Sequence, residues 1–260
     1  MSAPATTDVR AVKAPARRAR EGATSAVEFL TVIPVRSGAG DLRDAAVWFP
    51  FVGALVGGLA GATRFYAEGL FGSTVASVLA LTVLVVVTGA LHQDGLADCA
   101  DGLGIRGDRE RRLAVMRDPV IGVFGTLALL GWGLLLIAAL AQLSDADAFR
   151  ALLAAAVVGR WAALLHAAAT PPARRDGLGA AFGVTTASVI VASIAALAIV
   201  VLVDGPLRGL TGAAAGVLVA LAISAWARRT LGGRTGDTLG ATVAVTEVAV
   251  CLTLLAFARV

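Results

Sequence analysis

Residues 91–103 read LHQDGLADCADGL, a short stretch that contains three carboxylates. At about 100° per residue, a helix would place Asp94, Asp98 and Asp101 within an arc of roughly 60°. Three ionised carboxylates on one face repel one another, and nearby lipid disfavours their charge further. Because an all-oxygen set suits a hard divalent cation, we predict that they bind Mg²⁺. The alternative is a solvated acidic loop whose aspartates cap helix ends.

Arginines follow the aspartates closely, which is the pattern expected of a pyrophosphate site. A metal ion neutralises some phosphate oxygens, while guanidinium groups donate hydrogen bonds to the others. In MRDPVIGVFG, Arg117 is a predicted substrate ligand and stands beside Asp118. Membrane topology alone explains Arg109, Arg111 and Arg112.

A second acidic motif, RTGDTLGA, occupies residues 234–241. Its glycines either let backbone N–H groups approach a phosphate or merely interrupt a helix. We predict that Thr235 and Asp237 contact substrate, and Asp237 is also a candidate metal ligand. By contrast, GLGIRG (102–107) matches the dinucleotide-binding pattern GxGxxG without a preceding strand, so that match carries no function.

Two histidines and one arginine also lie in or beside apolar runs. His92 falls roughly opposite the aspartates and is either a proton shuttle or phosphate contact, or a buried structural residue. His166 is predicted to be packed core. Arg160 is predicted to pair inward with a carboxylate or a substrate group, because a charge within a membrane is costly.

Composition places the chain in a membrane. Of its 260 residues, 58% are hydrophobic and 15% are charged, whereas an ordinary soluble domain has about 25% charged residues. The apolar runs are long enough to cross a bilayer, which takes about 20 helical residues. We therefore predict an all-α polytopic bundle of about seven transmembrane helices: 46–66, 73–92, 120–142, 151–170, 187–204, 209–227 and 240–258. DGPLR is expected to join the fifth and sixth as a hairpin, and Gly53, Gly57 and Gly61 form a small-residue stripe for helix packing.

Basic residues concentrate in alternate loops and before the first span, so these parts are predicted to be cytoplasmic. This places the N-terminus and all the polar motifs on the cytoplasmic face. Residues 1–22 are predicted to be a disordered basic tail, and 23–260 a single membrane domain. Residues 24–35 are too short to span and are expected to lie along the interface.

Six motifs, in order, carry a resemblance to a known family: EFLTVIPV, WFPFVGALVG, HQDGLADCADGL, MRDPVIGVFG, ARRDGLG and GGRTGDTLGA. Their types and spacing resemble the cobalamin synthase family over nearly the whole chain from about residue 24. The resemblance implies a Mg²⁺-dependent adenosylcobinamide-GDP ribazoletransferase of the bacterial cytoplasmic membrane. Its substrates would be adenosylcobinamide-GDP and α-ribazole or α-ribazole 5′-phosphate, and no nucleic-acid partner is expected. A homo-oligomer, or an assembly with other late-pathway enzymes, stays open.

The resemblance also implies roles for individual residues. The three aspartates of the first motif would hold Mg²⁺ against the pyrophosphate, and Asp237 would complete that shell or bind a second ion. Asp118 would orient or deprotonate the attacking hydroxyl, and Arg117 would stabilise the developing charge. Arg174 would contact a phosphate of the GDP or of the ribazole.

Two rival functions remain at this stage. A CDP-alcohol phosphotransferase uses similar aspartates, but its motif closes on a DxxxD that this chain does not place after a suitable glycine. An ion-coupled transporter would place its site near the bilayer midplane, often within internal repeats. Here the acidic residues stand at one face, and no repeat is visible in the sequence.

Overall fold

The computed structural model describes residues 15–35, 42–177, 179 and 182–259. Within these ranges the chain forms α1 (Pro15–Leu30), α2 (Leu42–Ala45), the 3₁₀ turn η1 (Ala46–Trp48), α3 (Phe49–Thr88), α4 (Leu91–Gly104), α5 (Arg109–Val115), α6 (Val123–Leu140), α7 (Asp145–Ala169), α9 (Thr186–Thr230) and α10 (Gly236–Ala258). The extended pairing in these ranges is one isolated bridge between Pro172 and Arg234. The predicted all-α fold is therefore confirmed.

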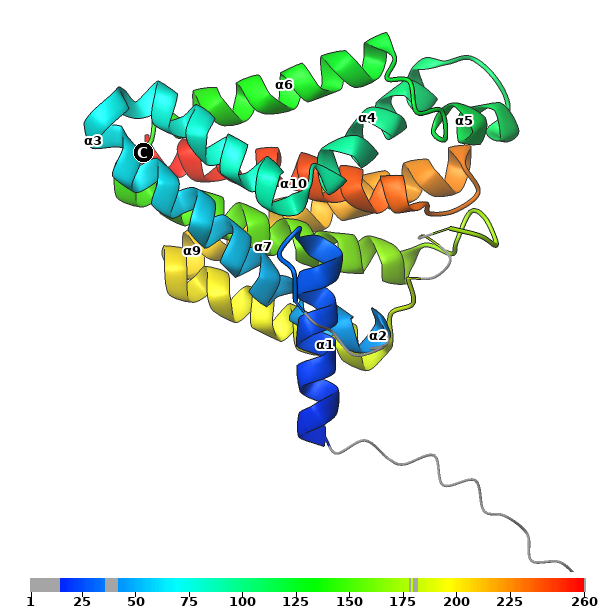
Figure 1. Ribbon diagram of the computed structural model, residues 1–260, viewed down its shortest axis with the longest axis horizontal. Helices are drawn as coiled ribbons and strands as arrows, with labels where there is room; N and C mark the ends of the chain where they lie inside the picture. The colour runs from blue at the N-terminus through cyan, green and yellow to red at the C-terminus, as the bar shows by residue number, and fades with distance from the viewer. Residues whose placement is uncertain (1–14, 36–41, 178, 180–181, 260) are drawn as a thin grey trace, which may run out of the picture.

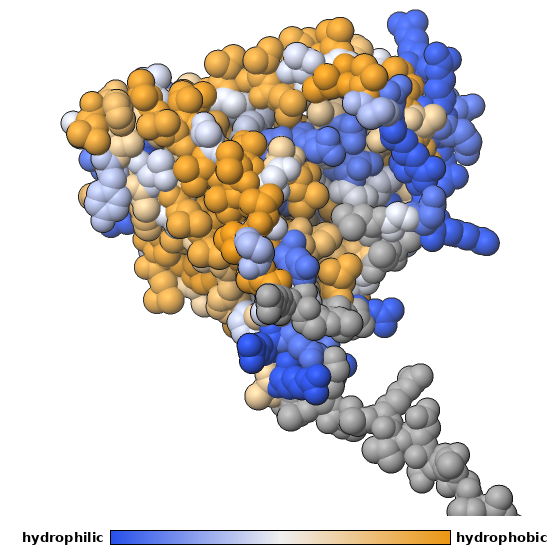
Figure 2. Space-filling view, in the orientation of Figure 1, coloured by the Kyte–Doolittle hydropathy of each residue, from blue (hydrophilic) through white to orange (hydrophobic). Residues whose placement is uncertain are grey.

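Five of the helices are long and apolar enough to cross a membrane, namely α3, α6, α7, α9 and α10. Their outward faces are apolar, as Figure 2 shows for one side of the molecule, and hydrophilic residues gather at the α4–α5 end and around α1. A polytopic membrane bundle is thus confirmed. The number of crossings and the cytoplasmic N-terminus stay predictions.

Two of the five helices are broken in the middle by a glycine. Gly72 in α3 and Gly205 in α9 have φ of 75° and 77°, a left-handed conformation that interrupts each helix. An added Cβ at Gly209 would lie 2.5 Å from the carbonyl oxygen of Val200, so the two arms of α9 pack against each other. The helical hairpin predicted at DGPLR is confirmed, and α3 is broken in the same way.

The hairpin of α3 is held by a buried arginine. The side chain of Arg64 is fully buried, and its Nε donates to Ser77 Oγ on the other arm at 3.1 Å. Its Nη2 donates to the carbonyl oxygen of Leu140 at 3.3 Å, and it also pairs with Glu68. One guanidinium group therefore ties both arms of α3 to the end of α6.

Helix α7 forms the centre of the bundle, packed against α3, α9 and α10 (Figure 1). The predicted glycine stripe explains the contact with α3. Added Cβ atoms at Gly53 and Gly57 would lie 2.6 Å from the carbonyl oxygens of Ala156 and Leu152. Only glycine permits this approach, so the stripe is confirmed as a packing surface.

Two predicted boundaries are wrong. The second span was expected to run from 73 to 92, but α3 ends at Thr88, and Gly89 and Ala90 adopt left-handed conformations before α4 begins. His92 therefore belongs to a separate short helix rather than to a span. The predicted disordered tail (1–22) is wrong for residues 15–22, because α1 begins at Pro15, while residues 1–14 lie outside the described residues.

Helix α1 runs across the direction of the long helices (Figure 1). Its inner face buries Ala26 and Leu30, whereas Arg17 and Arg18 are exposed and pair with Glu21 and Asp44. A helix that lies across the bundle with an apolar inner face and a basic outer face is typical of a membrane interface. The placement of residues 24–35 along the interface stays a prediction.

The glycine stripe yields a matched pair of substitutions. Gly57→Ala is expected to lower the melting temperature in detergent, because overpacking against the α7 backbone costs about 1–3 kcal/mol. An added Cβ at the adjacent Gly58 meets nothing within 4 Å. Gly58→Ala should leave the melting temperature unchanged or raise it, since alanine favours a helix over glycine by roughly 0.5–1 kcal/mol. Equal melting temperatures for the two variants would contradict this packing.

Candidate functional site

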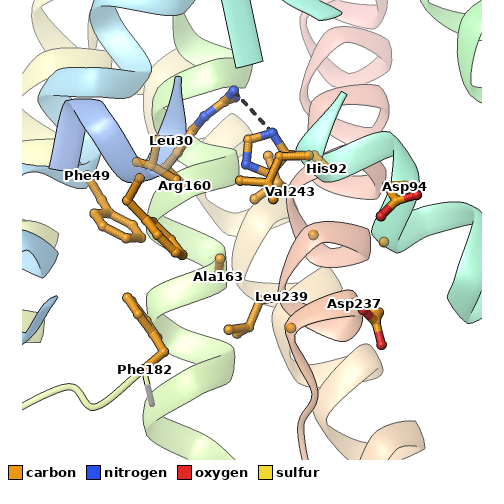
Figure 3. A pocket seen from close by; sticks show the side chains of 15 residues that line it. Leu30, Phe49, His92, Asp94, Arg160, Ala163, Phe182, Asp237, Leu239 and Val243 are labelled. Atoms are coloured by element: carbon orange, nitrogen blue, oxygen red, sulfur yellow. Dashed lines mark hydrogen bonds between the residues drawn. The ribbon is translucent and has the colours of Figure 1, made fainter. Parts of the chain in front are cut away.

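Helices α4 and α10 cross at very short range. An added Cβ at Gly95 would lie 2.6 Å from the carbonyl oxygen of Asp237, and one at Gly240 would lie 3.2 Å from that of Leu91. Because glycine stands at the crossing, the two backbones meet where each helix carries its acidic residues. Figure 3 shows Asp94 on α4 and Asp237 on α10 at the same end of one pocket.

The aspartates crowd one another electrostatically. Burial raises the pKa of Asp98 to about 7, and neighbouring charges add to the effect. The strongest of those charges is Asp237, followed by Asp94 and Asp101. The structure therefore brings together the acidic residues of both predicted motifs, which are about 140 positions apart in the sequence.

Asp101 has a further task. Its two carboxylate oxygens accept hydrogen bonds from the backbone N–H groups of Gly122 at 2.7 Å and Gly125 at 2.9 Å. These N–H groups open α6, where a carboxylate satisfies unpaired donors and favours the helix dipole. Asp101 therefore caps a helix, as the alternative interpretation of the aspartates predicted. Its role as a metal ligand stays a prediction.

The acidic side chains suit a cation by charge, but they are not arranged as a finished metal site. Within the described residues, no group of three or more His, Cys, Asp or Glu side chains stands ready to hold a metal ion. Burial and the repulsion between carboxylates both raise the pKa of Asp98, and the repulsion is what a divalent cation would relieve. Asp94, Asp98 and Asp237 fit such an ion by donor type and by charge.

An apolar pocket of about 660 Å³, part of it open to solvent, extends from Asp94 and Asp237 into the bundle. Phe29, Phe49 and Phe182 line it, and their ring centroids lie 5.4–6.0 Å apart. In Figure 3, Phe49 and Phe182 lie on the side of the pocket away from the two aspartates. The pocket thus has an acidic end and an aromatic end.

Arg160 and His92 supply the polar groups of the same pocket. Arg160 is fully buried, and its Nη1 donates to Glu247 Oε1 at 2.6 Å, so the predicted pairing with a carboxylate is confirmed. Its Nη2 lies 3.5 Å from His92 Nδ1 (Figure 3). Burial and the charge of Arg160 lower the pKa of His92 well below its usual value, so His92 is a neutral acceptor toward Arg160. His92 is therefore buried, and it also lines the pocket.

The second histidine is structural, as predicted. His166 is fully buried, with Nδ1 2.7 Å from Ser224 Oγ and Nε2 2.9 Å from Thr238 Oγ1. It connects α7 to α9 and α10. It is not among the residues that line the apolar pocket or the smaller polar pocket next to it.

A smaller polar pocket of about 360 Å³ meets the first at Gly236 and Asp237. Arg174 and Arg234 line it, and burial together with the charge of Arg117 lowers the pKa of Arg174. Thr235 caps α10, with its hydroxyl accepting from the N–H of Thr238 at 3.2 Å. Two guanidinium groups beside a helix N-terminus make a surface suited to phosphate oxygens.

The MRD motif is divided between this polar pocket and solvent. Arg117 pairs with Asp176, a residue of the polar pocket, at 2.9 Å. Asp118 is exposed and accepts from the N–H of Val120 at 3.0 Å. Asp118 lines neither pocket, so the structure does not bring it to the aspartates as the predicted base required.

Sequence reasoning missed the aromatic end of the pocket and Arg234. No role was predicted for Arg234, yet it is buried and donates to the carbonyl oxygen of Phe182 at 2.8 Å. Phe29, Phe49 and Phe182 come from three separate segments. Each stands within or near a recognised motif, but no spacing in the chain links them.

Comparison with known proteins assigns the family. The family model described as cobalamin-5-phosphate synthase matches residues 22–255. A protein from Azorhizobium caulinodans is 40% identical over 252 residues, covering 90% of this chain and 95% of its own. One from Sinorhizobium medicae is 42% identical over 244 residues, covering 86% and 92%. Both are named adenosylcobinamide-GDP ribazoletransferase. No solved structure matches the chain.

The hydrogen bonds of Asp101 yield a prediction in the absence of metal. In chelator, Asp101→Asn is expected to lower the melting temperature, because a hydrogen bond to a charged group contributes about 1.5–3 kcal/mol. Asp94→Asn is the matched control and should leave the melting temperature unchanged or raise it, since it removes a repelling charge. A higher melting temperature for Asp101→Asn would show that Asp101 acts only as one more repelling carboxylate.

Proposed function

This chain belongs to the cobalamin-5-phosphate synthase family, and we propose that its aspartates perform the family's transfer around a magnesium ion. The protein is an adenosylcobinamide-GDP ribazoletransferase, a membrane enzyme of late cobalamin synthesis. A ribose hydroxyl of α-ribazole, or of its 5′-phosphate, attacks the phosphorus next to cobinamide. The new P–O bond forms as the bond to GMP breaks, and the hydroxyl loses its proton.

The single observation that supports the magnesium ion is the crowding of acidic residues from two helices at one end of a pocket. Such a reaction requires mainly positioning and neutralisation of charge on the phosphoryl oxygens. We propose that Asp94, Asp98 and Asp237 hold the ion, with Asp101 contributing its charge while it anchors α6. When bound, Mg²⁺ would neutralise the pyrophosphate and stabilise the departing phosphate.

The polar pocket is the proposed site for the phosphate of the GMP portion. Arg174 and Arg234 offer guanidinium groups there, and the capping Thr235 lies at the N-terminus of α10. Arg117 reaches the same region through Asp176. These charges support the predicted roles of Arg174 and Arg117 in binding and in stabilising developing charge.

The position of Asp118 weakens its predicted role as the base. Asp94 and Asp237 line the apolar pocket, whereas Asp118 is exposed and lines neither pocket. The aspartates of α4 and α10 are therefore better placed than Asp118 to orient that hydroxyl.

We also propose that the active end faces the cytoplasm of a bacterial cell. α4, α5 and the start of α10 lie at one end of the bundle, opposite the breaks in α3 and α9 (Figure 1). The basic residues of α5 and of the loop before α10 are at that same end, which the positive-inside rule assigns to the cytoplasm.

Turnover in detergent or liposomes tests the function and the metal together. Adenosylcobinamide-GDP and α-ribazole 5′-phosphate are supplied with and without Mg²⁺, and GMP and the corrinoid product are both measured. We expect Mg²⁺-dependent, stoichiometric formation of both products.

Asp94→Asn and Asp237→Asn should each reduce kcat/KM at least roughly 100-fold, the loss expected when transition-state charge is left unneutralised. Asp118→Asn should cost less than about tenfold. Equal losses for all three variants would restore Asp118 to the site, and full activity in chelator would exclude the metal.

The raised pKa of Asp98 yields a pH dependence. A proton and a metal ion compete for the same carboxylate, so Mg²⁺ binding weakens as the pH falls through about 7. The Mg²⁺ concentration for half-maximal rate should rise roughly tenfold from pH 8 to pH 6, as expected for one competing proton. Saturating Mg²⁺ should recover most of the rate at pH 6.

The control for this prediction is Asp98→Asn, because substrate phosphates also bind protons in this range. If Asp98 titrates as described, the variant loses most of the pH dependence of its Mg²⁺ requirement. If wild type and variant show the same slope, the dependence belongs to the substrate and the assignment to Asp98 is wrong.

A further inference from the structure

We propose that the apolar pocket binds the aromatic base of the acceptor nucleoside and delivers its ribose to the aspartates. The inference rests on the proposed function and names the substrate portion that this pocket takes. α-Ribazole carries a dimethylbenzimidazole, a flat and largely apolar base with one unsubstituted ring nitrogen that accepts a hydrogen bond.

The walls of the pocket suit a flat aromatic ring. Phe49 and Phe182 lie on the side away from the aspartates, and Ala163, Leu239 and Val243 complete an apolar lining (Figure 3). Aromatic rings stack or meet edge to face at centroid separations of about 4.5–7 Å, and each such contact adds roughly 0.5–1.5 kcal/mol beyond burial. The pocket is partly open to solvent, so the ribose of a bound nucleoside can extend out of it while the base is held inside.

The buried polar groups also favour this base. Arg160 can only donate hydrogen bonds, its Nη1 is used by Glu247, and its Nε has no partner among the described residues. A fully buried donor without a partner is costly, and a ring nitrogen that accepts a hydrogen bond would satisfy it. Benzimidazole brings such an acceptor and no ring donor that would need a partner.

Guanine, the other base in the reaction, fits less well. Its N1–H and amino group are donors and require acceptors in the pocket. Away from the end proposed for the metal, the charged group that lines the pocket is the obligate donor Arg160, which lies beside His92; the charged acceptors, Asp94 and Asp237, lie at the metal end (Figure 3). Guanine placed in the apolar pocket would bury unsatisfied donors against a guanidinium group.

The geometry then matches the direction of attack. A base held among the phenylalanines leaves its ribose at the end where Asp94 and Asp237 stand. The attacking hydroxyl would reach the phosphorus from the apolar pocket, while the GMP phosphate would lie in the polar pocket beyond Asp237. In-line displacement requires entering and leaving oxygens on different sides of phosphorus, and two pockets that meet at one carboxylate provide them.

Direct binding of α-ribazole to the full-length protein in lipid nanodiscs tests the inference without turnover. Isothermal titration is performed on the wild type, on Ala163→Leu, which fills the pocket, and on Ala168→Leu, an exposed position on the same helix. We expect roughly tenfold weaker binding for Ala163→Leu and unchanged binding for Ala168→Leu, where tenfold corresponds to about 1.4 kcal/mol. Melting temperatures of both variants report whether each is folded.

A second test changes the ligand and not the protein, so its result does not depend on whether a variant folds. The wild type is titrated with the ribazole analogue in which a C–H replaces the unsubstituted ring nitrogen. If Arg160 donates to that nitrogen, the analogue binds at least roughly tenfold more weakly, because a hydrogen bond to a charged group is lost. Equal affinities would overturn the assignment of the base to Arg160.

The outcomes separate this inference from the proposed function. Absent binding of α-ribazole to wild type, or binding that Ala163→Leu leaves unchanged, overturns the inference even where turnover is normal. Weakened binding of a guanine nucleotide to Ala163→Leu, with α-ribazole unaffected, assigns the pocket to the donor instead. Binding that behaves as expected in a protein without turnover would support the pocket and contradict the proposed reaction.

Discussion

The approach of the α4 and α10 backbones is the constraint on which the site depends. A Cβ at Gly95 would collide with the Asp237 carbonyl group, so any other residue would push the helices apart. The separation would act directly on the site, because Asp94 adjoins Gly95 and Asp237 is the residue that is touched. The same contact orders the apolar pocket, which both helices line. A membrane protein gains little from apolar burial between helices, so small residues that permit close packing become decisive.

The buried pair of Arg160 and Glu247 raises a different question, because such pairs seldom stabilise a fold. Removing two charges from water costs several kcal/mol per ion. Well-packed apolar residues in the same positions often make the fold equally stable or more stable. Arg160 and Glu247 are both almost wholly buried, in two helices that are long and apolar enough to span the membrane. The presence of this pair is understandable if Arg160 binds a group at the pocket that an apolar residue could not bind. Glu247 then serves to keep the guanidinium group charged and in place, with neutral His92 on its other side.

Much of this arrangement could be predicted from the sequence, because local rules govern it. The length of the apolar runs predicted helices long enough to cross a membrane, and the DGPLR turn predicted a helical hairpin. Spacing placed the α4 aspartates together, and the cost of a charge in lipid predicted a partner for Arg160. The features that escaped prediction depend on tertiary contacts. No spacing rule brings Phe29, Phe49 and Phe182 together or turns Asp101 toward α6. The role predicted for Asp118 came from the resemblance alone, and the fold places this residue outside both pockets.

Under the proposed function, the position of Asp237 would let one site handle two chemically different nucleotide portions. It belongs to an apolar pocket on one side and to a polar pocket with two buried or half-buried arginines on the other. In the proposed reaction, the phosphorus next to cobinamide exchanges GMP, whose base is polar, for a ribazole, whose base is flat and largely apolar. Separate pockets that share a carboxylate let each partner be recognised by its own chemistry, while the reacting phosphoryl group stays between them. Because α10 begins at this point, one rigid element would supply both the N-terminal N–H groups suited to a phosphate and Asp237, a proposed ligand of the metal ion.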